Sequence, residues 1–150
     1  MKNLLLFGII ILIFQSTILG KVFSIGSLTA DFLVIYILLI SLNTSFNISM
    51  KSSFFLGILQ DLFALNFMNS VSKPFISFIT NKLKNYFFVS AFWIKATLVI
   101  FISFLDIFVK NIMLFIFKGA FEISIEYLFY LFINFLIFYL VYLTNEDFKI

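Results

Sequence analysis

Long apolar runs, separated by short polar stretches, follow one another along the whole of this 150-residue chain. Hydrophobic residues make up 63% of the sequence and charged residues only 11%, whereas a soluble domain carries roughly 25% charged residues. A helix needs about 20 residues to cross the hydrocarbon layer, so the chain has room for about six crossings. The sequence therefore predicts an all-α integral membrane protein, a bundle of about six transmembrane helices in a single domain over residues 1–150.

Six segments are predicted to be helices joined by short connections. They span approximately residues 4–20, 28–43, 53–69, 74–84, 92–118 and 123–143. The segment 74–84 is short and opens on Pro74, a residue that suits the first turn of a helix. We expect this segment either to cross the bilayer with the help of neighbouring helices or to dip in and return.

The lysines indicate an orientation. Six crossings place both termini on one side of the membrane, and five loop lysines lie on that side. The other side has three, which are Lys21, Lys73 and Lys118. Because lysine is enriched in cytoplasmic loops, we expect both termini to be cytoplasmic.

Several classes of function are disfavoured by what the sequence lacks. There is no His and no Cys, so imidazole and thiolate metal sites and the catalytic groups built on them are excluded. No Gly-rich phosphate-binding loop is present. The positive charges are spread along the chain, whereas nucleic-acid binding needs a basic face. We therefore expect a non-enzymatic protein without metal or cofactor.

A stripe of small and polar residues lies on one face of the third predicted helix. Ser53, Gly57, Asp61 and Ala64 recur at helical spacing, and small residues allow a second helix to approach closely. An ionisable group in a membrane helix is costly unless it is paired or faces protein. Asp61 is expected either to hold a partner helix or ligand, or to bond to the loop that follows, near Asn69.

Two further polar sets lie in the last two predicted helices. Asp106 and Lys110 are four residues apart, the favourable spacing for a charge pair on one helix face. We interpret them mainly as a pair that neutralises itself, with a proton or ion pathway as the alternative. Glu126, Tyr130 and Asn134 follow one another at intervals of four. Asn134 lies deepest and is expected to bond to another helix.

One carboxylate stands at a predicted helix start. Asp31 opens the second helix, where its charge complements the helix dipole, and we expect a structural role for it. An intramembrane enzyme or ion carrier is a further alternative. It would require Asp61, Asp106 and Lys110 to converge.

Three motifs together resemble the MreD family of bacterial rod-shape membrane proteins. They are FQSTIL at residues 14–19, ADFL at 30–33 and, above all, GILQDL at 57–62, which is similar to the family's Gly-x-x-x-Asp segment. The specific likeness covers Gln15 to about Thr80. The chain departs from the family at Ala30, where Pro is usual, and it lacks the glycines that often follow the Asp of the third helix.

The resemblance implies a fold and a role. The fold is the six-helix bundle of the substrate-binding subunits of energy-coupling-factor transporters. The role is that of a scaffold in the bacterial inner membrane, which binds MreC and links MreB filaments to RodA and its class B penicillin-binding transpeptidase. The faces that carry Ser53, Gly57, Asp61 and Ala64, and Glu126, Tyr130 and Asn134, are the candidates for helix recognition.

A substrate-binding subunit of a transporter of the energy-coupling-factor type is the main alternative function. In that case the polar groups inside the helices would line a ligand pocket. The first predicted helix lacks the Ala-x-x-x-Ala face with which such subunits dock on their energising module, and the loop at residues 20–27 is short for a lid.

Overall fold

The computed structural model describes residues 2–19, 24–25, 28–29, 31–84, 92–119, 121 and 124–144. In this part of the chain there are six α-helices and two very short strands. They are α1 (Lys2–Phe14), continued by a π-helical segment η1 (Gln15–Leu19), β1 (Ser24–Ile25), β2 (Leu28–Thr29), α3 (Phe32–Asn43), α4 (Phe46–Ala64), α5 (Asn69–Leu83), α6 (Phe92–Lys118) and α7 (Glu126–Thr144). The two strands pair antiparallel. The expectation of a helical protein is confirmed.

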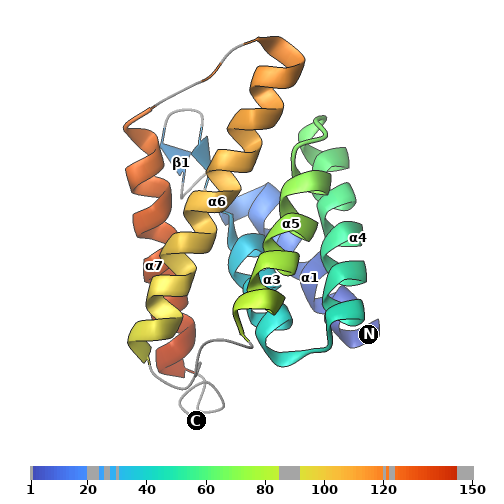
Figure 1. Cartoon of the computed structure of the whole chain (residues 1–150), viewed down its shortest axis with the longest axis vertical. Coiled ribbons are helices and arrows are strands. Elements are labelled where there is room, and N and C mark those ends of the chain that lie inside the picture. Colours follow the sequence, from blue (N-terminus) through green and yellow to red (C-terminus); the bar gives the residue numbers. More distant parts are fainter. Residues whose placement is uncertain are drawn as a thin grey trace.

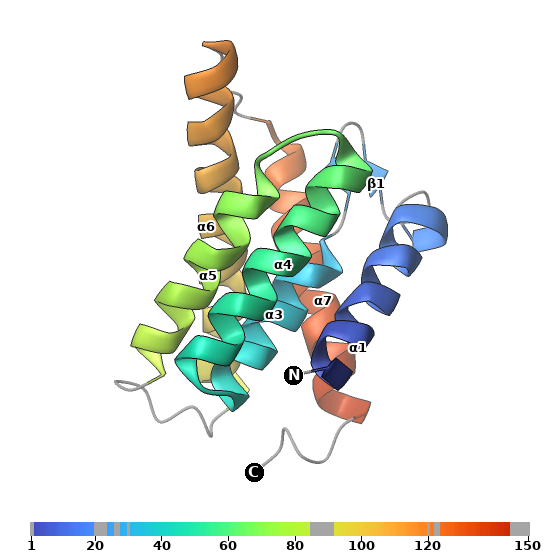
Figure 2. The ribbon, with the colours of Figure 1, turned by 90° about the vertical axis from the view of Figure 1, so that its right-hand side faces the viewer.

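Helix α3 lies at the centre of the bundle. It contacts α1, α4, α5, α6 and α7, and Figures 1 and 2 show it enclosed by these longer helices. Eight of its twelve residues are buried. The uniformly apolar segment is therefore a core element, as expected for a helix that is hydrophobic on all sides.

Helices α4 and α5 form a tightly packed hairpin. Gly57 on α4 faces the backbone of α5, because a Cβ built on it would come within 2.5 Å of the Asn69 carbonyl oxygen. Along the same interface the Asn81 amide donates to Ser49 Oγ over 2.7 Å. The contact therefore combines close backbone approach with polar pairing, the usual chemistry of helix pairs in lipid.

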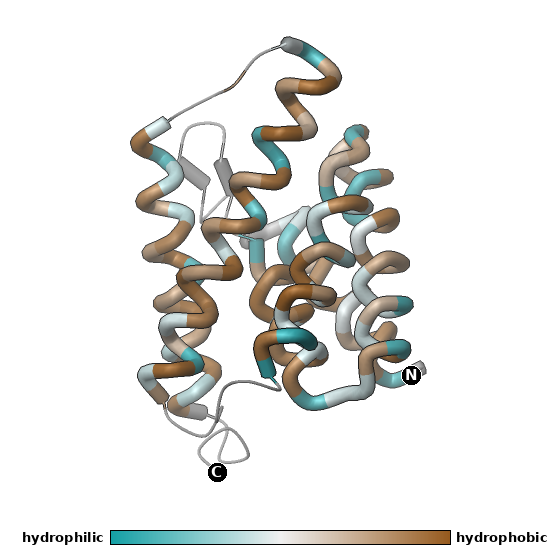
Figure 3. The backbone as a smooth tube through the Cα atoms, in the orientation of Figure 1, coloured by the Kyte–Doolittle hydropathy of each residue, from teal (hydrophilic) through white to brown (hydrophobic). Residues whose placement is uncertain are grey.

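Helices α6 and α7 are both long and apolar. They are the two described helices with enough length and hydropathy to cross a membrane, and apolar residues cover most of both in Figure 3. At one end their rings interlock: Phe92 stacks on Phe138 with centroids 6.3 Å apart and packs on Tyr142 at 4.8 Å. At this end the pair is joined by ring packing.

The outer surface of the bundle is strongly apolar. Phe54 on α4, Phe104 on α6 and Phe132 on α7 are 53%, 55% and 59% exposed. By contrast Lys73 and Asp106 are 0% exposed. This arrangement reverses that of a water-soluble protein, in which Lys and Asp are almost never fully buried.

Several helix boundaries differ from the predicted ones. The predicted helices 53–69 and 74–84 are found at Phe46–Ala64 and Asn69–Leu83, so that Pro74 lies inside α5 and not in its first turn. The predicted helix 28–43 begins at Phe32, because residues 28–29 form β2. The predicted helix 92–118 matches α6 at both ends. Residues 20, 30 and 123 of the predicted helices lie outside the described residues.

Candidate functional site

Four charged side chains from three helical elements meet inside the bundle, and we call them the charged cluster. Asp31 lies at the N-cap of α3, Lys73 on α5, and Asp106 and Lys110 on α6. Lys73 pairs with Asp31 and, over 3.1 Å, with Asp106. Lys110 pairs with Asp31 over 3.0 Å and with Asp106 over 2.7 Å. Each cation thus contacts both anions, and the four charges sum to zero.

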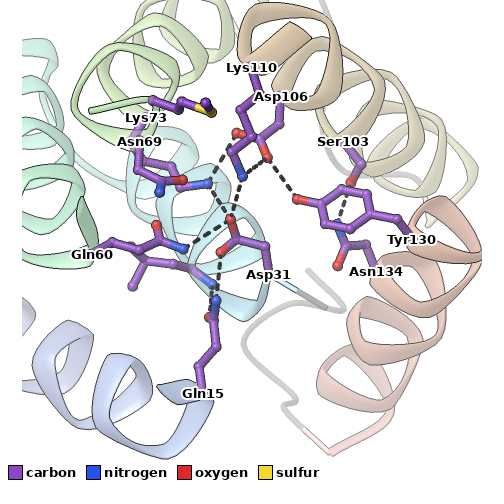
Figure 4. A network of polar contacts seen from close by, with 12 residues as sticks. Gln15, Asp31, Gln60, Asn69, Lys73, Ser103, Asp106, Lys110, Tyr130 and Asn134 are labelled. Atoms are coloured by element: carbon purple, nitrogen blue, oxygen red, sulfur yellow. Dashed lines mark hydrogen bonds and ion pairs between the residues drawn. The ribbon is translucent and has the colours of Figure 1, made fainter. Parts of the chain in front are cut away.

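Neutral donors complete the shell around the two carboxylates (Figure 4). The side-chain amides of Gln15 and Gln60 donate to the two oxygens of Asp31 over 3.3 and 3.2 Å. The Tyr130 hydroxyl donates to Asp106 Oδ2 over 2.8 Å. The shell therefore ties α4, α7 and the end of the first helical segment to the charged cluster.

The ion pairs connect α3, α5 and α6, and the two positive charges balance the two negative ones. A buried ion pair is costly to desolvate, and removing one partner leaves an uncompensated charge. All four carboxylate oxygens accept at least one hydrogen bond. Among the described residues no group of three His, Cys, Asp or Glu is placed to hold a metal ion. The cluster is almost wholly buried: Asp31, Asp106 and Lys110 border a cavity, and of these only Lys110 has substantial exposure.

A cavity of about 380 Å³ lies against the charged cluster. It reaches the end of the bundle at which α4 turns into α5 and α6 leads to α7. Polar side chains from α4, α5, α6, α7 and η1 form much of its wall, among them Gln15, Gln60, Asn66, Lys110, Asn111 and Tyr127. Ligand sites are concave and carry a few converging polar groups. This cavity has both properties, which set it apart from the apolar surface of the bundle.

Asp61 does not join the charged cluster. Its carboxylate accepts the backbone N–H groups of Asn69 and Ser70 over 2.8 and 2.7 Å, and also the Asn69 side-chain amide over 2.9 Å. It therefore caps the start of α5 and fixes the α4–α5 turn. Of the two roles expected for Asp61, the structure supports the bond to the following loop. The convergence of Asp61 with Asp106 and Lys110, which an intramembrane enzyme would require, is not found.

Of the other members of the predicted stripe on α4, Gly57 faces α5 of the same chain. Ser53 is buried and donates to the carbonyl of Met50 over 3.0 Å. Gly57 is the point of close approach to α5. Ala64 is exposed at the end of α4 and borders the polar cavity. Gly57 thus allows a second helix to approach closely, and that helix is α5.

The predicted face of α7 also turns inward. Tyr130 and Asn134 are buried, and Asn134 donates to Ser103 Oγ on α6 over 3.1 Å. Asn134 does bond to another helix, as expected. Glu126 is half-buried and lines the polar cavity.

Sequence reasoning missed half of the charged cluster. It placed Lys73 in an outer loop and gave Asp31 only a role at its own helix end, whereas the two are paired across 42 residues of sequence. A signal was present at Asn69, Lys73 and Ser77, which lie at intervals of four within α5. A polar stripe on a membrane helix has to face protein, which indicates a buried Lys73.

An apolar groove of about 540 Å³ runs along the outside of the bundle between α1 and α3. Its walls include Phe7, Ile10, Phe14, Ile35 and Leu39, and the end of α7 closes one side with Ile137 and Val141. The groove lies on the apolar surface and has no charged residue in its wall.

No family model, no curated protein and no solved structure matches the chain.

Proposed function

We propose that this chain is a multi-pass protein of the bacterial inner membrane, with six crossings and both termini in the cytoplasm. Two helices have the length and hydropathy for a crossing by themselves. Helix α3 has 12 residues, or about 18 Å of helix, which is short for a hydrocarbon layer of about 30 Å. Its enclosure by other helices supports a crossing, because short segments are tolerated where protein shields them.

Within that membrane we propose a non-enzymatic scaffold of the MreD type. It would bind MreC and link MreB filaments to RodA and its class B transpeptidase. The motifs at residues 14–19, 30–33 and 57–62 carry the likeness. The structural support is that the charged cluster and Asp61 are engaged with groups of their own chain, which suits a rigid framework more than a reaction centre.

The observation that carries the proposal is the open apolar groove between α1 and α3. Its walls are apolar along both helices, and several of the wall residues, such as Phe7 and Phe14, are exposed. A partner in contact with such a wall gains from van der Waals packing within lipid. We assign the groove to the membrane-anchor helix of MreC.

Co-purification of MreC with the tagged chain tests this assignment. Ile10, which is 41% exposed, lines the groove, while Ile100 on α6 is 44% exposed and lies outside it. We expect Ile10→Trp to fill the groove and reduce the captured MreC by about tenfold, equivalent to about 1.4 kcal/mol. Ile100→Trp adds the same bulk elsewhere and should leave capture unchanged. Capture that is unaffected by Ile10→Trp, or equally reduced by both variants, would contradict the assignment.

The polar cavity favours a second candidate, a substrate-binding membrane subunit of a transporter of the energy-coupling-factor type. The two candidates differ in what accompanies the purified chain. A vitamin retained through purification supports the transporter subunit, whereas retention of MreC without a vitamin supports the scaffold.

A further inference from the structure

Lys110 differs from the other members of the charged cluster in its access to the polar cavity. Its side chain is 25% exposed, whereas those of Lys73 and Asp106 are 0% exposed. An ammonium group has three hydrogens, and Asp31 and Asp106 engage two of those of Lys110. Asp31 and Asp106 also border the cavity, but they are 3% and 0% exposed, so Lys110 is the most accessible charge of the cluster.

The carboxylates do not depend on Lys110 for hydrogen bonds. Asp31 accepts from Gln15, Gln60 and Lys73, and Asp106 accepts from Lys73 on one oxygen and from Tyr130 on the other. If Lys110 turns toward another anion, every carboxylate oxygen still has a donor. The ammonium group of Lys110 can thus also bind a second anion in the cavity.

Charges of both signs line the rest of the cavity. Lys118 lies two helical turns beyond Lys110 on α6, and α7 contributes Glu126. Ile107 and Leu114 on α6 add apolar wall. An acidic group near Lys110 and a basic group near Glu126 would both meet the opposite charge.

The size of the cavity limits the occupant. Its 380 Å³ corresponds to about a dozen water-sized groups at 30 Å³ each. A small organic molecule fits this space, and a folded segment of protein does not.

From these observations the geometry points to a binding site for a small zwitterion of the amino-acid type. Its carboxylate binds Lys110, its ammonium group faces Glu126, and its side chain packs on Ile107 and Leu114. The site does not rest on the scaffold role, and either proposed function is compatible with it.

Thermal unfolding of the purified full-length chain in detergent tests the site. The probes are the proteinogenic amino acids, each at millimolar concentration. We expect at least one of them to raise the unfolding midpoint by several degrees, because a ligand that binds only the folded state stabilises it. For the best binder, the deaminated acid and the decarboxylated amine should each bind more weakly than the parent. The absence of a shift with every amino acid, or an amine that binds as well as its parent, would overturn the proposal.

Substitutions locate the site. Lys110→Met should weaken binding by about ten- to a hundredfold, the effect of losing a hydrogen bond to a charged group, and Lys110→Arg should restore most of it. Lys82→Met is the matched control, because Lys82 is exposed on α5 and does not line this cavity. Binding that survives Lys110→Met overturns the placement.

If Lys110→Met does not fold, the site is tested on the native chain by comparing the binding of the parent amino acid, the deaminated acid and the decarboxylated amine. Capture of MreC is a separate readout, so failure of the site and failure of the scaffold role are distinguishable.

Discussion

The helix pair α4–α5 and the helix pair α6–α7 are held together by different chemistry. The first pair meets through Gly57, the Asp61 cap and the hydrogen bond between Asn81 and Ser49. The second pair meets through the rings of Phe92 and Phe138, with polar contacts only further along. The first interface is therefore polar and closely packed, whereas the second combines an aromatic end with polar contacts further along.

The difference bears on why length and hydropathy identify only one of the pairs. Many polar residues of α4 and α5 are buried, but an average over the sequence counts them against a crossing, and α5 has only 15 residues. Helices α6 and α7 carry large apolar side chains on their exposed faces, and both have the length and hydropathy of a membrane span. Average hydropathy thus measures composition, whereas lipid contact depends on which face of a helix is exposed.

The charged cluster joins the two pairs, and breaking it should have the largest effect. Lys73→Met leaves Asp31 and Asp106 with one cation and takes from Asp106 Oδ1 the donor that holds it. We expect the free energy of unfolding to fall by about 3–5 kcal/mol, the usual loss when a buried ion pair loses one partner. Titration of the detergent-solubilised chain with sodium dodecyl sulfate measures this loss. Lys110→Met should cost less, because every carboxylate oxygen keeps a donor. Equal losses for the two variants would contradict this account of the cluster.

A substitution confined to α4–α5 should have a smaller effect. Gly57→Ala places a methyl group against backbone, whereas Gly8→Ala on α1 meets side chains, the end of Leu56 at 2.6 Å and the ring of Tyr36 at 3.0 Å. Because backbone yields less than a side chain, we expect Gly57→Ala to cost about 1–3 kcal/mol and Gly8→Ala clearly less. The same detergent titration measures both. If Gly8→Ala is the more damaging, α4 and α5 are not packed as closely as described.

The smallest effect is expected at the turn that Asp61 stabilises. Leu65 has a left-handed backbone with φ of 52° and is 92% exposed. A side chain in this conformation costs roughly 1–2 kcal/mol, and Gly avoids that strain while losing about 0.5–1 kcal/mol in chain entropy. Leu65→Gly should therefore raise the free energy of unfolding by about 0.5–1 kcal/mol. Destabilisation by Leu65→Gly would show that the Leu side chain has a contact of its own.

Sequence alone predicts the features that are local along the chain. The helix 92–118 is a long apolar run with Lys at its end, and Asp106 and Lys110 are one turn apart, so both the helix and the pair follow from spacing. The start of α5 does not follow from spacing. Asn69 and its neighbours are polar and suggest a loop, but the Asp61 carboxylate caps them into a helix.

The remainder of the site depends on tertiary contacts. Lys73 pairs with Asp31 across 42 residues and with Asp106 across 33, and no local pattern specifies which helices bring them together. The polar cavity likewise takes its wall from five elements. Recognising the polar stripe on α5 predicts that Lys73 is buried, but not which carboxylates it meets.

The most direct test of the membrane account is the labelling of single cysteines by a reagent that cannot cross the bilayer. The chain has no Cys of its own, so every signal comes from the introduced residue. Phe104→Cys on α6 is the decisive variant, because Phe104 is 55% exposed in the structure and would lie in lipid. Phe67→Cys and Phe121→Cys mark the connections at one end of the bundle, and Ser45→Cys marks the other end.

The account predicts that intact cells label the cysteines at positions 67 and 121 from outside, and the cysteine at position 45 only after the membrane is opened. The cysteine at position 104 should stay unlabelled in both conditions, and react once the protein is unfolded in detergent. Labelling at position 104 as fast as at position 67 in the folded protein would contradict the claim that the apolar outer surface faces lipid.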